Sequence, residues 1–309
     1  MRIDRRRFLT ISAAVAGAAL LLPRGLLAAP QATVWRGQAL GAPTTLILNH
    51  PDPARAQVLL RETAAELRRL EAIFTLYRAE SELSRLNRDG YLLAPSPEML
   101  AALDLAGRVH VATGGRFDPT VQPLWRAYAA GDAQAIAAAR SGLGFGRVRI
   151  SRARILLAPG QALTLNGIAQ GVITDRITDL LRAGGAEHTL VDMGEFRAIG
   201  GRSAQEPWSV RLAGGGHALL TDRALATTEA RGFSFDPEGR LPQLIDPATG
   251  KARADWARVS VIADSAGLAD GLSTGLSLAP AAAIRAALPH LPGVEVRALD
   301  ASGQEFRFT

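Results

Sequence analysis

Hydrophobic positions along this chain follow two periods, which separate the expected helices from the expected strands. Between residues 53 and 74, apolar side chains recur every three or four positions, the spacing of one face of a helix. These positions are Leu60, Ala64, Leu67, Leu70 and Phe74. The pattern therefore predicts a helix over 53–74 with one buried side.

Capping residues set the expected limits of further helices. Ser96, Pro97 and Glu98 form a helix start, and that helix should run to about Thr113 before the glycine pair at 114–115. Glycine pairs or prolines delimit the other expected helices. These helices are 171–183, 266–278 with Asp264 as a candidate N-cap, and 281–288 with Pro280 in its first turn.

Short β-prone runs account for most of the remaining apolar positions. The expected strands are 33–35, 44–48, 146–150, 154–157, 189–193, 208–212, 258–263, 294–297 and 306–309. Several of them pair as hairpins, and they alternate irregularly with the helices. This order favours an α+β fold over a doubly wound parallel sheet.

The first 29 residues read as an export signal rather than as part of the fold. A twin arginine at Arg5 and Arg6 precedes an apolar run of about 12 residues at 11–22, and small residues suited to cleavage follow at 26–29. The run is short for a stable span of a ~30 Å hydrocarbon core, although an uncleaved anchor is the alternative. We expect a twin-arginine signal peptide over 1–29, one domain over 30–309, contact with the twin-arginine translocase, and a periplasmic location.

Charge and cysteine content exclude several classes of function. The chain has 35 basic and 29 acidic residues. Segment 1–29 contains five of the basic residues and one of the acidic ones, so the formal net charge of the remainder is 30 − 28 = +2. The remaining basic residues show no aromatic interleaving, so nucleic acid is not an expected partner. With no cysteine, disulfides, zinc–thiolate sites and a lipid-anchored cysteine are all excluded.

Three segments could carry chemistry, each with a plain structural alternative. Residues 114–125 form a glycine- and proline-rich loop in which Asp118 precedes Pro119, and its alternative is a capped turn. Residues 164–171 form a glycine-containing turn at a helix start, where backbone N–H groups can bind an anion; its alternative is a tight packing turn. This turn does not have the G-x-G-x-x-G spacing, so a dinucleotide fold is not indicated.

The third segment is 264–275, where Asp270 and Thr274 are four residues apart and share one helix face. A carboxylate and a hydroxyl together suit Mg²⁺ or Ca²⁺, provided that another loop completes the site; otherwise both side chains only pack. The five histidines show no metal-ligand spacing, and no serine lies in a nucleophile-elbow context.

Taken in order, six segments resemble the motifs of the FAD:protein FMN transferase (ApbE) family. They read T-L-Y-R-A-E-S-E-L-S-R-L-N at 75–87, F-D-P-T-V at 117–121, G-I-A-Q-G at 167–171, V-D-M-G-E at 191–195, I-D-P-A-T-G at 245–250 and A-D-G-L-S-T at 269–274. The resemblance covers the chain from about residue 33 to its end. It favours the functional interpretation of all three segments.

The resemblance implies an α+β fold with an FAD cleft, and transfer of FMN from FAD to a Thr or Ser hydroxyl of a partner protein, with release of AMP. It also implies a divalent cation, Mg²⁺ or Ca²⁺, on Asp270, Thr274 and the carbonyl of Gly167. Asp270 is then the expected catalytic residue as well. The residues implied to contact FAD are Leu40, Tyr77, Arg116, Phe117, Asp118, Thr164, Gln170 and Gln243. The implied acceptor carries D-x-x-[ST]-G-A-[ST] and is membrane-associated.

Four positions depart from the family pattern. Gln170 stands where Lys is frequent, Gln243 where His is frequent, and Asp192 and Glu195 where Asn and Gly are usual. Three of these changes resemble an exported, NosX-like subgroup tied to nitrous oxide reductase maturation. The departures leave two alternatives open: a non-catalytic FAD-binding assembly protein and an FAD pyrophosphatase. Residues 246–252 superficially resemble the acceptor motif, but they are predicted to form a turn, with Thr249 unmodified.

Overall fold

One large antiparallel sheet organises the chain in this computed structural model, which describes residues 32–309 except 231, 233, 237, 239 and 240. The expected signal segment 1–29 lies outside the described residues. The helices are α2 (Pro53–Phe74), α3 (Glu82–Asp89), α4 (Pro97–Ala112), α5 (Gln122–Ala130), α6 (Ala133–Ala139), α7 (Ala169–Ala183), α8 (Ala266–Leu276) and α9 (Ala281–Ala287).

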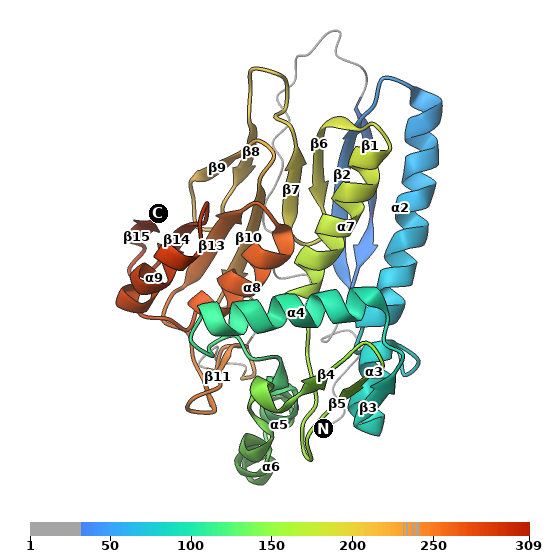
Figure 1. Cartoon of the computed structure of the whole chain (residues 1–309). Coiled ribbons are helices and arrows are strands. Elements are labelled where there is room, and N and C mark those ends of the chain that lie inside the picture. The colour runs from blue at the N-terminus through green and yellow to red at the C-terminus, as the bar shows by residue number, and fades with distance from the viewer. Residues whose placement is uncertain (1–31, 231, 233, 237, 239–240) are drawn as a thin grey trace.

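The strands of the large sheet lie in the order β1-β2-β6-β7-β10-β13-β14-β15. Their bounds are β1 (Thr33–Ala39), β2 (Ala42–Asn49), β6 (Glu187–Asp192), β7 (Phe196–Ile199), β10 (Ala224–Glu229), β13 (Arg258–Ala263), β14 (Glu295–Leu299) and β15 (Glu305–Phe308). The first and last hairpins of the described chain therefore form opposite edges of one sheet (Figure 1). The expected α+β class is confirmed.

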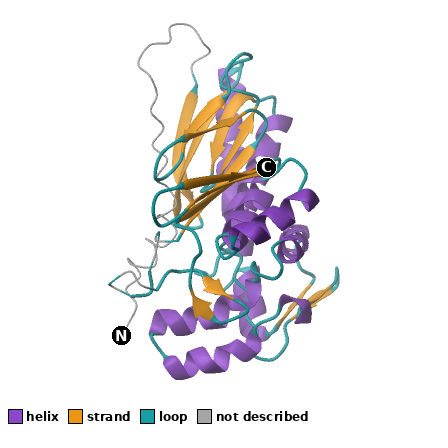
Figure 2. Cartoon of the chain, turned by 90° about the vertical axis from the view of Figure 1, so that its left-hand side faces the viewer, coloured by secondary structure: helices purple, strands orange, loops and turns teal. Residues whose placement is uncertain are grey.

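Two hydrophobic clusters lie on opposite faces of this sheet. The larger one packs α2, α4, α7 and α8 against the sheet, and includes Leu59, Leu103, Ile173 and Leu272. The smaller one lies between the sheet and the hairpin β8 (Trp208–Arg211) and β9 (His217–Leu220), and is built around Trp208 and Phe196. The helices gather on one side of the sheet and the hairpin covers the other (Figure 2).

Helices α2 and α4 begin and end where their capping residues place them. Asp52 accepts hydrogen bonds from the backbone N–H groups of Ala54 and Arg55, and proline follows at the first helical position. Ser96 caps α4 in the same way through the N–H of Met99. The two expected helices are confirmed to within one residue.

The C-terminal helices differ slightly from expectation. Helix α7 begins two residues before Gly171, and α8 ends at Leu276 rather than at 278. The candidate cap Asp264 is wrong, because the Ser265 hydroxyl accepts from Leu268 N–H while the Asp264 carboxylate pairs with Arg223. Pro280 precedes α9 as its N-cap residue instead of occupying its first turn.

A smaller group of elements lies below the sheet in the view of Figure 1. It contains α3, α5, α6 and a three-stranded sheet of β3 (Tyr91–Leu93), β5 (Arg154–Leu156) and β4 (Arg149–Ile150). Strands β11 (Ile245–Asp246) and β12 (Lys251–Ala252) flank the predicted turn, where Thr249 donates to the Asp246 carboxylate at 3.1 Å. No helix in the described part of the chain has an apolar stretch long enough to cross a bilayer.

Candidate active site

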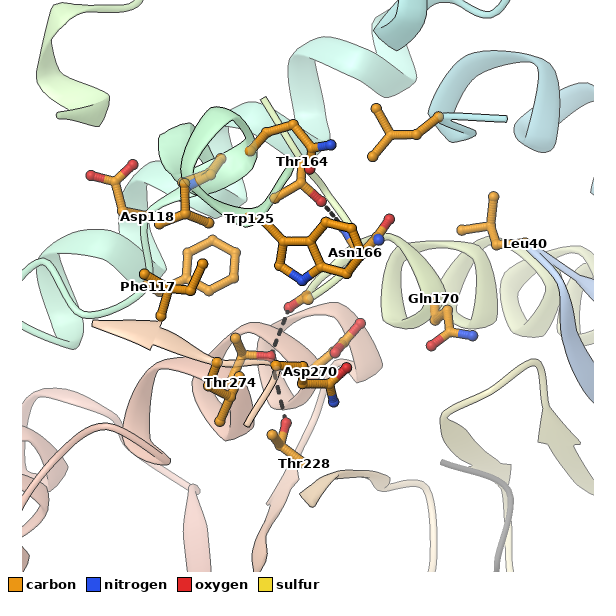
Figure 3. A pocket seen from close by; sticks show the side chains of 18 of the residues that line it. Leu40, Phe117, Asp118, Trp125, Thr164, Asn166, Gln170, Thr228, Asp270 and Thr274 are labelled. Carbon is orange, nitrogen blue, oxygen red and sulfur yellow. Dashed lines mark hydrogen bonds between the residues drawn. The ribbon is translucent and has the colours of Figure 1, made fainter. Parts of the chain in front are cut away.

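A single pocket between the sheet helices and the smaller group collects all the predicted site residues. It has an empty volume of about 1310 Å³, part of which is open to solvent. The predicted residues that line it are Leu40, Tyr77, Arg116, Phe117, Asp118, Thr164, Gly167, Gln170, Gln243, Asp270 and Thr274. Residues as far apart in sequence as Leu40 and Thr274 therefore meet in one place, as Figure 3 shows for several of the lining residues.

The three residues predicted to hold a cation are neighbours. The Thr274 hydroxyl lies 3.4 Å from the Gly167 carbonyl oxygen, and Asp270 lies one turn earlier on α8. A Cβ on Gly167 would come within 2.8 Å of the Thr274 Oγ1 atom. Only glycine therefore allows this carbonyl to approach the hydroxyl so closely.

Close packing of α7 against α8 places the Asp270 carboxylate. Its Oδ2 atom accepts a hydrogen bond from Gly171 N–H at 3.0 Å, and its Oδ1 atom has no partner among the described residues. Gly171 allows this approach, because a Cβ there would lie 2.3 Å from the Ala266 carbonyl oxygen. One carboxylate oxygen therefore joins the helices, and the other is left for a ligand.

Two buried carboxyl groups line this end of the pocket, and a third, Asp192, lies half-buried near Glu195. Burial raises the pKa of Asp270 to about 7, with Asp175 adding to the rise and the Gly171 hydrogen bond opposing it. Burial, followed by the charge of Asp270, raises the pKa of Glu195 well above its usual value. Burial also raises the pKa of Asp192 to about 7. No ion pair among the described residues involves any of these carboxyls, so a cation would favour their charged forms.

The donor set fits a hard divalent cation beside a phosphate. A carboxylate, a hydroxyl and a carbonyl are all oxygen ligands, which Mg²⁺ prefers, and Mg²⁺ completes its shell with water or substrate phosphate. The described residues contain no cluster of three His, Cys, Asp or Glu side chains that would form an all-protein site. Gln170 lines the pocket with 8% of its surface exposed, and its Nε2 atom is buried without a hydrogen-bond partner.

The loop between α4 and α5 supplies another wall of the pocket, and its polar groups are mostly engaged within the protein. Asp118 accepts from Thr120 N–H at 2.8 Å and from Phe145 N–H at 3.2 Å. Arg116 donates to the carbonyl oxygens of Thr113 and Leu278. Asp118 therefore caps its turn, as the structural alternative predicted, and also lines the pocket, as the family resemblance predicted.

The pocket also includes residues that the sequence did not single out as site residues. Among them, Glu195 was noted only as a departure from the family pattern, and Asn166 only as part of the glycine turn. Thr228 lies in β10, for which no strand was predicted, with its Oγ1 atom 3.5 Å from that of Thr274. Trp125 lines the pocket from α5. A motif search could have found Glu195 and Asn166, but Thr228 has no local signal.

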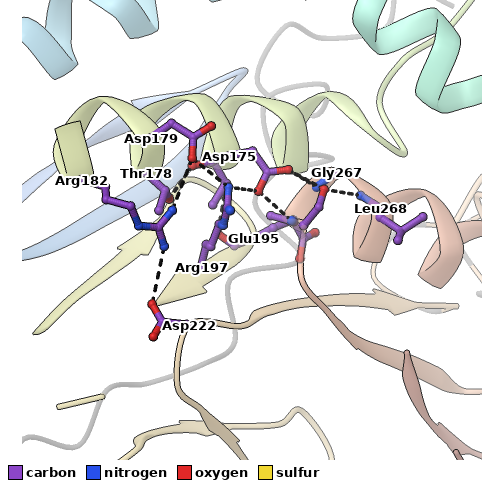
Figure 4. A network of polar contacts seen from close by, with 12 residues as sticks. Asp175, Thr178, Asp179, Arg182, Glu195, Arg197, Asp222, Gly267 and Leu268 are labelled. Atoms are coloured by element: carbon purple, nitrogen blue, oxygen red, sulfur yellow. Dashed lines mark hydrogen bonds and ion pairs between the residues drawn. The ribbon is translucent and has the colours of Figure 1, made fainter. Parts of the chain in front are cut away.

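A polar network behind the pocket fixes α8 against α7 (Figure 4). The Asp175 carboxylate on α7 accepts from Ala266 N–H at 2.8 Å, from Gly267 N–H at 2.9 Å and from the Ser265 hydroxyl at 2.7 Å. Arg197 on β7 pairs with the same carboxylate at 2.8 Å. An acidic group at a helix N-terminus satisfies otherwise unbonded N–H groups. Asp175 therefore sets the position of the helix that carries Asp270 and Thr274.

Comparison with known proteins gives this fold and pocket a family. A model of the ApbE family matches residues 40–298, so the chain belongs to the ApbE family. A Klebsiella pneumoniae protein named FAD:protein FMN transferase is 27% identical over 275 residues, which are 80% of this chain and 79% of that protein. The chain is accordingly an enzyme of the transferase class.

Two solved structures share the architecture. A variant of the flavin transferase ApbE from Vibrio cholerae superposes with a TM-score of 0.78 at 25% identity, covering 90% of this chain and 97% of that one. The ApbE protein from Thermotoga maritima superposes with a TM-score of 0.80 at 21% identity, again covering 90% and 97%. The fold of this chain is therefore the ApbE fold over nearly its whole described length.

Proposed function

We propose that this chain transfers FMN from FAD to a Thr or Ser hydroxyl of a partner protein, with a bound divalent cation, and releases AMP. Membership of the ApbE family supports this proposal, since the relatives are named FAD:protein FMN transferase. The observation that carries it is the meeting of all predicted FAD and cation residues in one pocket.

In the proposed reaction the acceptor oxygen forms a bond to the phosphorus of the FMN half. The bond from that phosphorus to the bridging oxygen of the pyrophosphate breaks, AMP leaves with the electron pair, and the hydroxyl loses its proton. A cation on Asp270, Thr274 and the Gly167 carbonyl would neutralise phosphate charge when bound. Asp270 is the proposed catalytic residue because it is the carboxylate of this set.

The chain's own groups would bind and orient the pyrophosphate. Helix α7 begins at the pocket without a side-chain cap from its N-cap residue, and its dipole favours anions there. Ala169 N–H bonds to the Leu165 carbonyl and Gly171 N–H to Asp270, so Gln170 N–H is the donor of this first turn that remains for a phosphate oxygen. The Gln170 side chain, which lines the pocket and whose Nε2 atom has no partner, would turn its amide N–H toward the pyrophosphate as a further donor. The family's frequent Lys would supply a charge at this position, whereas Gln170 supplies a neutral donor.

We further propose that the enzyme acts in the periplasm after export by the twin-arginine translocase. Its acceptor would be a membrane-associated protein with a D-x-x-[ST]-G-A-[ST] segment, such as a component of the nitrous oxide reductase system. The twin arginine at 5–6 and the NosX-like residues Gln170, Asp192 and Glu195 support this placement.

A transfer assay tests the proposal against its alternatives. Residues 30–309 are incubated with FAD, Mg²⁺ and a soluble acceptor domain carrying D-x-x-T-G-A-T, and flavin fluorescence is read on a denaturing gel. We expect a fluorescent acceptor band that EDTA abolishes. Free FMN and AMP without a labelled acceptor would instead identify a pyrophosphatase. Tight FAD binding with neither product would identify an assembly protein, with Gln243 as the first residue to restore to His.

A further inference from the structure

The outer face of the small sheet exposes apolar and basic side chains together. Tyr91 and Leu93 on β3 are 49% and 63% exposed. They stand opposite Leu156 and Arg154 on β5, and Arg149 on β4 also stands opposite Leu156. Residues opposite one another in a ladder share a face, so these side chains project together. The other face, with Leu92 and Ile155, is buried in the core.

The arginines of this region have no acidic partners. Arg149 and Arg154, together with Arg152 in the turn between β4 and β5, take part in no ion pair among the described residues, and all three are exposed. The chain has no acidic residue from 133 to 174. The acid nearest to β3 in sequence, Asp89, is paired with Arg88 at 2.9 Å. This concentration of positive charge is local, because the chain from residue 30 onward carries only about two net positive charges.

We propose that Tyr91, Leu93, Arg149, Arg152 and Arg154 form a basic face that binds the surface of a bilayer containing anionic phospholipids. Arginines attract phosphate headgroups, while exposed Leu and Tyr side chains enter the interfacial layer. The basic face has side chains of both kinds: three arginines, one leucine and one tyrosine.

Size argues for lipid rather than for a protein partner. The three strands contain only eight residues between them, whereas a stable protein interface takes about 800 Å² and some 20–30 residues from each partner. An interfacial contact with lipid needs only a few basic and apolar side chains. The chain also lacks the cysteine on which a lipid anchor would be built.

This attachment would place the enzyme where a membrane-associated acceptor lies, and so raise its effective concentration there. The inference stands apart from flavin transfer, since vesicle binding is measured without FAD or acceptor.

Vesicle co-sedimentation of residues 30–309, which contain every described element, tests the basic face. Vesicles of phosphatidylcholine alone are compared with vesicles that contain about 30% phosphatidylglycerol, whose negative surface mimics an anionic leaflet. We expect binding only to the anionic vesicles, weakened by salt because exposed charges are screened. The triple variant Arg149→Gln/Arg152→Gln/Arg154→Gln should lower the partition constant about 100-fold, at about fivefold for each arginine. Leu93→Ser should lower it by about tenfold.

The matched control is Arg61→Gln/Arg68→Gln/Arg211→Gln, which removes three other exposed arginines that also have no ion pair. It should retain most of the binding, and both triple variants should keep the wild-type melting temperature. Equal loss in the two triple variants would mean that net charge alone is responsible and would overturn the proposal. If the wild-type protein does not bind anionic vesicles, the proposal is overturned too. It is also overturned if flavin transfer to a soluble acceptor needs the same three arginines, because the face would then bind a protein partner.

Discussion

At the scale of single residues, glycine has the most specific role in this pocket. Gly167 can present its carbonyl beside the Thr274 hydroxyl only because it lacks a side chain. The proposed cation site thus depends on an absent Cβ as much as on the oxygen groups themselves.

Gly167→Ala should therefore weaken Mg²⁺ binding. The added methyl group lies 2.8 Å from the Thr274 Oγ1 atom, so the ligands must separate. Such overpacking costs about 1–3 kcal/mol, or about 5- to 150-fold in Mg²⁺ affinity measured by titration calorimetry with FAD present. Gly146→Ala is the control, because a Cβ there meets no atom within 4 Å. Equal Mg²⁺ affinity in both variants would exclude a close role for Gly167.

The half-buried carboxyl of Asp192 should make the metal-free protein less stable as pH rises. Its pKa is raised to about 7 in the fold from an ordinary value near 3.8. Between these values the folded state holds a proton that the unfolded state releases, so the free energy of unfolding falls as pH increases from about 4 to 7.

Asp192→Asn removes this contribution. In EDTA, the urea-unfolding free energy of the variant relative to wild type should rise by up to about 2.7 kcal/mol between pH 5 and pH 8, at about 1.4 kcal/mol for each pH unit below the folded pKa. A difference between the two proteins that stays constant across this range would contradict the raised pKa.

Much of the site could be predicted at this scale, and the part that could not has a physical reason. Asp270 and Thr274 are four residues apart on a helix, so local spacing placed them on one face. Thr228 reaches Thr274 only because β10 lies beside α8 in the fold. Its segment, A-L-A-T-T-E, shows no period that would mark a strand or a ligand.

At the scale of elements, the pair α7 and α8 forms the frame of the pocket. Asp175 bonds to the first N–H groups of α8, and Asp270 returns a bond to Gly171 of α7. Two reciprocal contacts therefore set the register of the helices that carry the proposed cation ligands.

Asp175→Asn should disturb this register without removing any ligand. The amide keeps one acceptor but loses the charge that four donors share, at a cost of about 1–3 kcal/mol. We expect a lower melting temperature and a raised KM for Mg²⁺, with kcat largely restored at saturating Mg²⁺. Asp179→Asn, which is 56% exposed and only 3.3 Å from the same Arg197, should change neither. Loss of kcat that Mg²⁺ cannot restore would assign Asp175 a different role.

A capping residue made a helix predictable only where a long apolar period followed it, since the short helices α3 and α6 have the caps Ser81 and Asp132 and were not predicted. Helices α2 and α4 carry Asp52 and Ser96 immediately before a proline, a signal that is local in sequence. The missed strands β7 and β9 have four residues each and β10 has six. All three are stabilised by pairing with neighbouring strands and by the second hydrophobic cluster. Such strands depend on tertiary packing more than on intrinsic preference.

At the scale of the whole molecule, the sheet order explains why one pocket draws on distant segments. Strands β1 and β2 lie beside β6, and β10 lies between β7 and β13, so the loops and helices between these strands converge. The family resemblance anticipated this convergence, whereas the hydrophobic pattern alone indicated only an α+β class.

Export of the whole chain should depend on its twin arginine. Changing Arg5→Lys and Arg6→Lys keeps the charge but removes the pair that directs folded proteins to the twin-arginine route. Cell fractionation should then find the precursor retained in the cytoplasm, while wild type reaches the periplasm. Arg61→Lys/Arg68→Lys on the exposed side of α2 is the control and should be exported normally. Equal export of the two variants would refute the predicted signal.

The central claim is that this pocket transfers FMN to a protein, and the intact mass of an acceptor domain tests it most directly. The acceptor is incubated with FAD, Mg²⁺ and either wild-type enzyme or Asp270→Asn. We predict that wild type adds the mass of one FMN at the threonine of the motif and that Asp270→Asn slows this by at least about 100-fold, as expected for loss of a charged ligand. An unmodified acceptor with wild type, or equal modification by both proteins, would contradict the account.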